Sequence, residues 1–170
     1  GIGGTGVQQL LDEQVIGGAG AAPDDSDVRD IFEAPVNVCD NCGTEIEAWY
    51  RAAEDGPHTF RISADDNAHL WMGADVWASA AGTQADDIAS VPGWTSNRQW
   101  NKYGEQQAAA VTLTAGSYTY MRAIANEGGG GDNLEIGIAN VDGMSPIPVT
   151  TADGAVLLVT DYVGIPLPAD

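Results

Sequence analysis

The sequence predicts an all-β domain, an antiparallel β-sandwich with long loops and a minor helical segment near the N-terminus. Apolar and polar residues alternate in several short segments, which is the period of a half-buried strand. Gly, Pro and Asp residues separate these segments, as turns require. The one helix-like stretch, residues 7–14, is too short to define a fold class.

The strands are expected in a simple order. Residues 46–51 alternate, a turn follows at 54–57, and a second strand covers 60–64 before Leu70 and Met72 mark a third. Later strands are expected at residues 111–113, 118–124 and 134–138, with a turn at 115–116. Antiparallel pairing of such short strands is typical of a sandwich.

Two longer segments leave alternatives open. Residues 75–107 form a long connection that carries Trp77, Trp94 and Trp100, and connections of this length are usually functional or locally folded. These tryptophans are either sugar-stacking platforms or core and loop-anchoring residues. Residues 156–159 and 162–163 either add an edge strand or begin a link to a neighbouring domain.

Length and composition indicate one domain with a real core. The chain has 170 residues, 44% of them hydrophobic. We expect a sandwich domain over residues 1–145 and a C-terminal edge strand or linker over residues 146–170. The glycine-rich start and the proline-containing end are typical of inter-domain connections, so other domains of the same large chain are expected partners. The sequence shows neither an apolar run long enough to span a membrane nor a leader peptide, and no membrane insertion is expected.

The net charge of the chain indicates which classes of partner it can bind. There are 25 acidic residues against 6 basic ones, a formal net charge of −19. Such an excess repels nucleic acid and anionic membranes, and it makes cations the natural counterpart. We therefore expect no nucleic-acid partner, and an extracellular, secreted or cell-surface setting.

Cys39 and Cys42 form a single Cys-x-x-Cys pair. One such pair without further Cys or His ligands does not complete a tetrahedral zinc site. In an oxidising compartment we expect a local disulfide, with two reduced cysteines as the alternative.

Two segments carry the metal chemistry. The sequence ADDN at residues 64–67 and the sequence EGGGGDN at residues 127–133 each follow an alternating segment, so each is expected on a loop at the same side of a sheet. Ca²⁺ prefers several oxygen ligands at about 2.3–2.6 Å, and glycine leaves backbone carbonyls unobstructed. The alternative is a solvated turn and a flexible hairpin loop.

The sequence PHTFRISADDNAHLW at residues 57–71 resembles the core motif of the anthrax protective antigen homology domain. Similar segments follow in order over roughly residues 1–140, at 32–35, 40–44, 88–95, 100–103, 113–116 and 127–134. That family is a β-sandwich module of bacterial toxins, glycosidases, adhesins and yeast flocculation lectins. One departure is Cys42, where relatives commonly carry Tyr.

The resemblance implies a set of site residues. Asp65 and Asp66 match an aspartate pair that is joined by a cis peptide and binds calcium. Asp132 and the backbone carbonyls of Gly129 and Gly131 match the second calcium loop. Asp65, Asp66 and Asp132 would also accept hydrogen bonds from sugar hydroxyls. Residues expected at the rim of the sugar site are Asn67, Asn133, Arg98, Glu105 and Gln106.

The predicted function is a calcium-dependent carbohydrate-binding module, a lectin, of a large bacterial surface or secreted adhesin. An open calcium position would take two vicinal hydroxyls of a neutral sugar. The alternatives are a structural or protein-docking spacer with structural calcium, and an accessory module of a secreted glycosidase. Catalysis is not expected, because Asp65 and Asp66 are adjacent and neither His58 nor His69 has a recognisable nucleophile beside it. Asp24, Asp25 and Asp27 are expected to form either a further ion site or a solvated turn.

Overall fold

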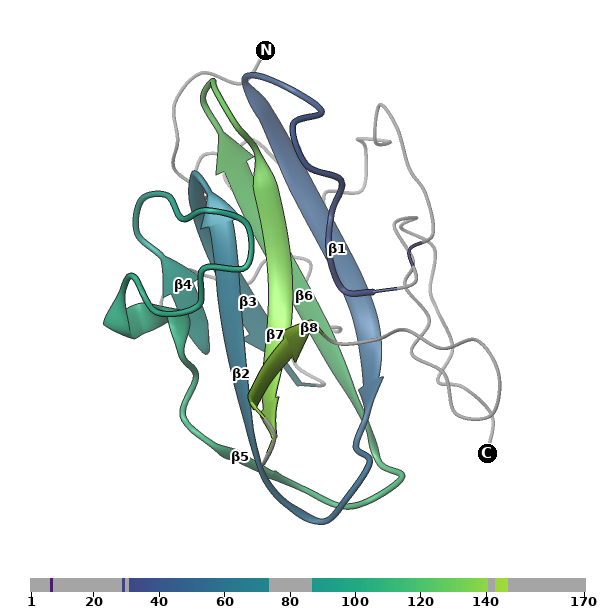
Figure 1. The fold of residues 1–170 in the computed structure, drawn as a ribbon. Helices are drawn as coiled ribbons and strands as arrows, with labels where there is room; N and C mark the ends of the chain where they lie inside the picture. The colour runs from purple at the N-terminus through teal and green to yellow at the C-terminus, as the bar shows by residue number, and fades with distance from the viewer. Residues whose placement is uncertain (1–6, 8–28, 30, 74–86, 141–142, 147–170) are drawn as a thin grey trace.

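A computed structural model of the chain describes residues 7, 29, 31–73, 87–140 and 143–146. The described chain forms two four-stranded sheets that pack face to face, so the predicted antiparallel β-sandwich is confirmed (Figure 1). Every strand pair in both sheets is antiparallel.

The first sheet has the strand order β1-β6-β3-β4. Its strands are β1 (Cys42–Arg51), β6 (Tyr118–Glu127), β3 (Asn67–Met72) and β4 (Ala89–Val91). The second sheet has the order β5-β2-β7-β8, with β5 (Val111–Leu113), β2 (Gly56–Asp65), β7 (Asn133–Asn140) and β8 (Gly143–Pro146). The chain passes from one sheet to the other several times, and among the described strands only β3–β4 and β7–β8 are consecutive strands within one sheet.

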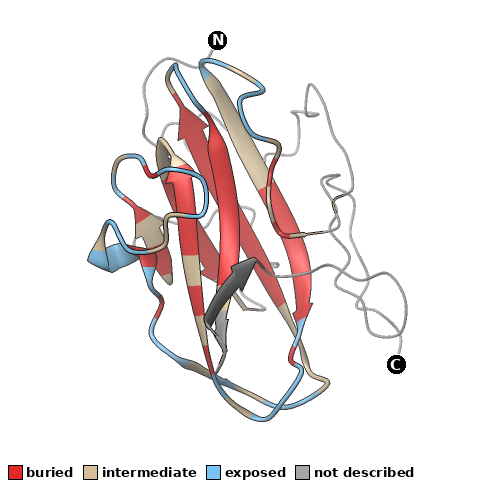
Figure 2. Cartoon of the chain, viewed as in Figure 1, coloured by how far each residue is buried: buried red, intermediate tan, exposed pale blue. Residues whose placement is uncertain are grey.

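The core lies between the two sheets, where alternate strand residues direct their side chains inward. Figure 2 shows that long stretches of the central strands are buried. Phe60, Ile62 and Ala64 of β2 face Leu70, Met121 and Ala123 of the opposite sheet as members of one buried cluster. Burial of this apolar surface is the main force that holds the sheets together. The alternation in the sequence therefore identified six of the eight described strands and missed the short strands β4 and β8.

The segment after β4 folds locally against the outer face of the second sheet. It contains a short 3₁₀ helix, η2 (Gly104–Gln106), and it is anchored by buried Thr95, whose backbone N–H donates to Ala64 O at 2.6 Å. Glu135 of β7, fully buried, accepts hydrogen bonds from Ser63 Oγ, from Asn97 Nδ2 and from the backbone N–H of Arg98. Burial raises the pKa of Glu135 to about 7.

The outer face of the first sheet also carries buried charges. Arg122 of β6 pairs with Glu45 and lies 3.9 Å from Glu47, both on β1. Tyr120 donates its hydroxyl hydrogen bond to Glu47. Burial raises the pKa of Glu45 to about 7 even though the Arg122 guanidinium opposes the rise.

Several sequence predictions fall outside the described residues. Of the helix-like stretch only Val7 is described; it is helical and fully buried, and its N–H donates to Asn67 Oδ1 at 3.1 Å. Trp77, the acidic cluster at residues 24–27 and the expected strands at 156–163 lie outside the described part. The predicted boundary after residue 145 stays a prediction.

The register of the strands brings separate loops to one end of the sandwich, the upper end in Figure 1. Asp65, the last residue of β2, is opposite Asn133, the first residue of β7. Glu127, the last residue of β6, is opposite Cys42, the first residue of β1. Loops far apart in the sequence therefore meet at this end.

Candidate cation site

The aspartate pair lies at the junction between β2 and β3. Asp65 ends β2, Asn67 begins β3, and the Asp65–Asp66 peptide bond is cis. The chain thus crosses from one sheet to the other at this single step. Both side chains lie at the end of the sandwich where the glycine loop, defined as residues 128–132, joins β6 to β7.

Three carboxylates meet beside this junction. One oxygen each from Asp65, Asp66 and Glu127 lie within 4.8 Å of one another. Glu127 is only 3% exposed, and within the described part of the chain neither of its carboxylate oxygens has a hydrogen bond of regular geometry, the Gly129 N–H being a nearby donor that only partly compensates the charge. Asp66 Oδ2 accepts the Gly128 N–H at 3.1 Å. A buried carboxylate whose charge is only partly compensated carries a high desolvation cost, so this cluster calls for a cation.

The electrostatics of the metal-free site agree with this geometry. Burial, and next the adjacent Asp66 carboxylate, raise the pKa of Asp65 to about 6. Burial and the charges of Asp66 and Asp65 raise the pKa of Glu127, and the nearby Gly129 N–H offsets only part of the rise. Like charges this close disfavour joint ionisation. A divalent cation would reverse that preference.

Glu127 was not among the predicted ligands, although the sequence contains the signal that identifies it. Ala123 and Ala125 of β6 face the core, and strand side chains alternate, so Glu127 falls on the core-facing side. A carboxylate on the inner side of a strand end needs either a partner or an ion.

Asp132 lies near the three carboxylates but has other contacts of its own. Its charge contributes to the raised pKa of Asp65 and of Glu127. Its Oδ1 accepts the Val38 N–H at 2.7 Å, and it is 4% exposed. Gly129 and Gly131 flank Gly130, whose φ of +125° favours glycine. The Cβ position of Gly131 is 3.8 Å from Asp65 Oδ2, so the glycine loop passes directly beside the aspartate pair.

The structure places the predicted rim residues differently from one another. Gln106 is fully buried: its Nε2 donates to Ile62 O and Gln99 O, and its Oε1 accepts two backbone N–H groups. Asn67 Nδ2 donates a hydrogen bond to Val91 O, and Asn67 Oδ1 accepts one from the Val7 N–H. The polar atoms of these two residues already hold the fold together, so we do not include them in the proposed sugar site, and ligand contact by them stays a prediction.

Two other predicted rim residues, Asn133 and Glu105, have polar atoms that could still bind a ligand. Asn133 is buried opposite Asp65; its Nδ2 donates to Thr95 O, while its Oδ1 has no hydrogen-bond partner. Glu105 is exposed. Arg98, by contrast, forms an ion pair with Glu33 at 2.8 Å and is committed to that contact.

An exposed aromatic surface lies near the acidic cluster. Trp94 is 51% exposed, and the Lys102 Nζ lies 3.1 Å from the centroid of its ring. The same Nζ donates to Trp94 O, and the Lys102 charge lowers the pKa of Asp65 against the larger effect of burial. A tryptophan stacked with a lysine is held in one orientation at the surface.

Cys39 and Cys42 are joined by a disulfide. They lie with Asp132 in a group of the right size for a metal, but a disulfide offers no thiolate ligands. The two histidines have different contacts: His58 Nδ1 lies 3.0 Å from Gly56 O, and His69 pairs with Asp87 and stacks on Trp71. Both lie in strands.

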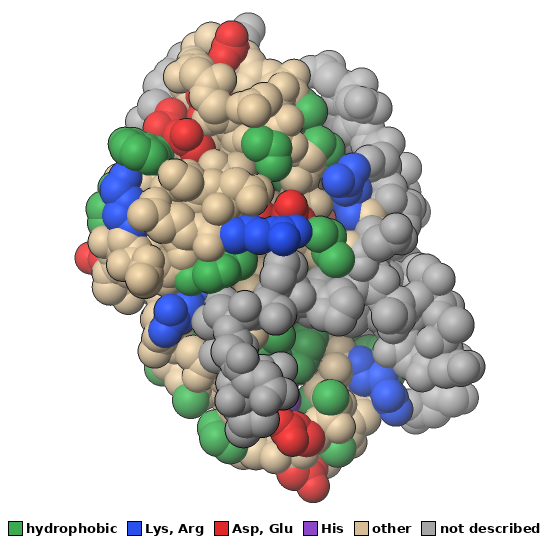
Figure 3. All heavy atoms as spheres, viewed as in Figure 1, with side chains coloured by type: hydrophobic (Ala, Val, Ile, Leu, Met, Phe, Trp, Pro, Cys, Tyr) green, Lys and Arg blue, Asp and Glu red, His purple; other side chains and the backbone are tan. Residues whose placement is uncertain are grey.

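The residues fit a hard cation. The available donors are carboxylate, amide and backbone oxygens, which suit Ca²⁺ and Mg²⁺ rather than metals that prefer sulfur or imidazole. On the face drawn in Figure 3, Lys and Arg side chains are scattered singly and form no basic patch. Among the described residues, no helix has the length and apolar character to cross a membrane.

A family model for the GLEYA domain matches residues 43–140, more than half of the chain. The chain belongs to the GLEYA domain family. This match corrects the family expected from the sequence: the chain is not an anthrax protective antigen homology domain, and only the general kind of β-sandwich is shared. The expectation rested on similar segments spread over roughly residues 1–140, which include the paired aspartate and the glycine loop. The expected bacterial setting loses its basis with that family.

Solved structures from Candida glabrata are also similar to the chain. The Epithelial Adhesin 6 A domain in complex with Galβ1-3GlcNAc is 17% identical, with a TM-score of 0.44, over 71% of this chain and 57% of that chain. The Epithelial Adhesin 9 A domain in complex with Galβ1-4GlcNAc is 16% identical, with a TM-score of 0.45, over 61% of this chain and 47% of that chain. The GLEYA domain described here thus spans about half the length of these structures.

Proposed function

We propose that this GLEYA domain is a calcium-dependent carbohydrate-binding module of a secreted or cell-surface adhesin. The observation that carries the proposal is the acidic cluster of Asp65, Asp66 and Glu127, in which both oxygens of Glu127 are buried without a hydrogen bond of regular geometry from the described residues. The GLEYA family includes the lectin domains of fungal adhesins, which supports a glycan as the ligand and an extracellular location.

The proposed ligands come from two loops. Asp65 and Asp66 supply carboxylates from the β2–β3 junction, and Glu127 adds a third from the end of β6. Asp132 and the carbonyls of Gly129 and Gly131 complete the set from the glycine loop. When bound, the ion supplies a Lewis-acidic position for sugar hydroxyls, and the carboxylates around it accept their hydrogen bonds.

The sugar is proposed to be neutral, with two vicinal hydroxyls directed at the ion. Asn133 and Glu105 are proposed as polar contacts at the rim. Trp94 offers an apolar ring beside this position, which suits the C–H face of a hexose. Single-site binding is expected in the millimolar to micromolar range, because one monosaccharide makes few contacts in an open site. Repeated modules on one cell would then act through avidity.

The domain is proposed to be non-catalytic. Glycoside hydrolysis uses two carboxyl groups roughly 5–9.5 Å apart on either side of a bond. Here the three carboxylate oxygens lie within 4.8 Å of one another, on one side of the site, which suits a shared ion. Release of a chromophore from a chromogenic glycoside by the purified domain would contradict this assignment.

A structural spacer with calcium as a clamp is the second candidate. It is favoured by the burial of Glu127, since a buried ion at the meeting point of both sheets would stabilise the fold without any glycan. Glycan retention distinguishes the two functions, because only a lectin retains a glycan in a calcium-dependent way.

The test uses a glycan array with the wild-type domain, in calcium and in chelator, beside Asp66→Asn. Glu54→Gln is the matched control, because Glu54 is exposed in the loop that joins β1 of the first sheet to β2 of the second, away from this end. We expect glycan retention by wild type and by the control in calcium only, and none by Asp66→Asn. Calcium binding without any retained glycan would favour the spacer, and unchanged calcium stoichiometry in Asp66→Asn would contradict the site.

A further inference from the structure

The cysteine loop, defined as residues 37–42, lies against the glycine loop. The Asn37 N–H donates to Asp132 O at 3.0 Å, and the Val38 N–H donates to Asp132 Oδ1 at 2.7 Å. The Gly130 N–H donates to Asp40 Oδ1 at 3.0 Å. Asn37 Oδ1 is 3.1 Å from the Cβ position of Gly131. The cysteine loop therefore contacts the glycine loop from residue 130 to residue 132.

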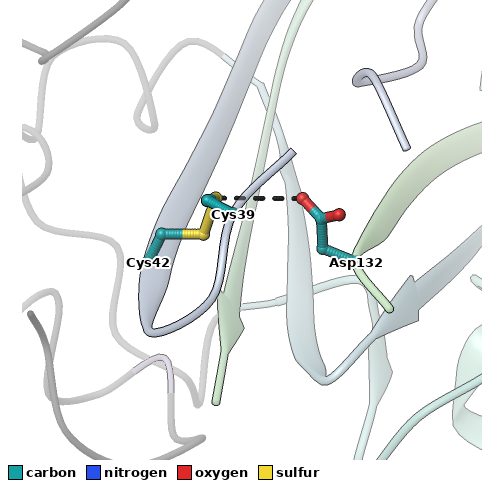
Figure 4. A group of neighbouring side chains, drawn as sticks. All are labelled: Cys39, Cys42 and Asp132. Carbon is teal, nitrogen blue, oxygen red and sulfur yellow. Dashed lines mark hydrogen bonds between the residues drawn. A yellow bond between two sulfur atoms is a disulfide. The ribbon is translucent and has the colours of Figure 1, made fainter. Parts of the chain in front are cut away.

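The disulfide fixes the shape of the cysteine loop. It joins Cys39 to Cys42, the first residue of β1, and Cys42 is opposite Glu127 in the sheet. Asn37, which precedes Cys39, and Asn41, which lies between the two cysteines, have φ values of +56° and +55°. The chain turns tightly at both positions. Figure 4 shows the disulfide beside Asp132, with Cys39 Sγ 3.8 Å from its Oδ2. Since a disulfide sulfur carries no hydrogen, this is a packing contact.

Glycine loops bind cations poorly when they are free. Glycine loses more conformational entropy on ordering than any other residue, and an ion that orders a loop must offset that loss. A loop that is already held binds with less loss, which is the advantage of preorganisation. The three hydrogen bonds from the cysteine loop hold the glycine loop before any ion arrives.

We propose that the disulfide-closed cysteine loop positions the glycine loop for the cation, and that reduction of the disulfide weakens cation binding. The cation part of this inference rests on the proposed function. The cysteine loop precedes the stretch that matches the GLEYA model, and the glycine loop that it contacts lies within that stretch.

The redox step balances with a dithiol as reductant. One thiolate of the dithiol attacks a sulfur of the disulfide and releases one cysteine thiolate, which leaves a mixed disulfide between the dithiol and the other cysteine. The second thiolate of the dithiol then attacks the dithiol sulfur of this mixed disulfide and releases the second cysteine thiolate. The protein gains two electrons and two protons as the Cys39 and Cys42 thiols, and the dithiol becomes a disulfide. A dithiol can reach the disulfide, because Cys39 lines a cavity of about 270 Å³ together with Asn37, Val38, Asp40 and Gly130.

The experiment measures two quantities in the whole chain. Amide hydrogen exchange at Gly130 reports on the loop without any metal, and calorimetry with CaCl₂ reports on cation affinity. Three samples are compared with the oxidised wild type: the wild type after dithiothreitol, Asp40→Ala, and a Cys39→Ser/Cys42→Ser double variant. Asp55→Ala is the matched control, because Asp55 caps Ala115 N–H in a similar way outside this end of the sandwich.

We expect Gly130 exchange to be at least tenfold faster, and the calcium Kd at least tenfold weaker, in all three samples but not in the control. Unchanged Gly130 exchange in the reduced and variant proteins would overturn the proposal that the cysteine loop holds the glycine loop in place, whatever the calcium result. Faster exchange with unchanged calcium affinity would overturn the link between the cysteine loop and the cation. If the oxidised wild type binds no calcium, the proposed function fails. The exchange rates still test whether the cysteine loop holds the glycine loop in place.

Discussion

The substitution Glu127→Gln separates a cation ligand from an ordinary buried residue, because it should change two quantities in opposite directions. The glutamine keeps the shape of the side chain and removes its charge. In the metal-free protein, Glu127 faces two carboxylates whose oxygens lie within 4.8 Å. Two unit charges at that distance repel by about 3.5 kcal/mol at an effective dielectric constant near 20.

The measurable gain is smaller than the summed repulsion, because the raised pKa values of Asp65 and Glu127 already relieve part of it by protonation. We expect the free energy of unfolding in chelator to rise by about 1–3 kcal/mol. At about 2–4 °C for each kcal/mol in a domain of this size, Tm in chelator should rise by about 5 °C.

Calcium binding should weaken at the same time. Affinity at oxygen-ligand sites depends on the number of charged ligands, so loss of one of the three clustered carboxylates should raise the calcium Kd roughly 10- to 100-fold. The assays are thermal unfolding in chelator and in excess calcium, with calorimetry for Kd. Glu135→Gln is the control, because Glu135 is equally buried but is hydrogen-bonded in a different site. A Glu127→Gln variant that is less stable in chelator and binds calcium within twofold of wild type would refute the ligand role.

The remaining predictions concern the glycan, salt and pH. Trp94→Ala should weaken glycan binding about tenfold, roughly 1.4 kcal/mol, while calorimetry shows an unchanged calcium Kd; an equal loss of both would contradict a stacking role. Chelator should lower Tm, and less so at high salt, because salt screens the net charge of −19; identical melting curves in calcium and chelator at low salt would exclude a stabilising ion. The free energy of unfolding in chelator should fall as pH rises from about 4.5 to 7, because the folded state holds a proton on Glu135, whose pKa is about 7, that the unfolded state has released. Glu135→Gln should reduce this fall in the free energy of unfolding by at most about 3 kcal/mol, and the remainder is expected from Glu45, Asp65 and Glu127, whose pKa values are also raised; a rise with pH instead of a fall in urea titrations would refute the assignment.

The strands could be predicted from the sequence because strand periodicity is local. Alternation over residues 46–51, 60–64 and 118–124 marks which side chains enter the core, and the structure places strands over all three. The aspartate pair and the glycine run were also visible as oxygen-rich segments that follow strands. Family membership was predicted wrongly from similar segments spread over roughly residues 1–140, and the match of residues 43–140 to the GLEYA model overturns that prediction.

Partners across the fold depended on the tertiary structure. Only the register of β6 against β1 and β3 brings Glu127 beside Asp65 and Asp66, and no spacing in the sequence encodes that register. Gln106 looks like a surface residue in the sequence, yet the fold of residues 94–107 buries it under four hydrogen bonds. The sequence by itself determined which residues carry oxygen ligands and which residues alternate. The packing of distant loops decided which of those oxygens face one another, because contacts between loops depend on how both sheets close around a single core.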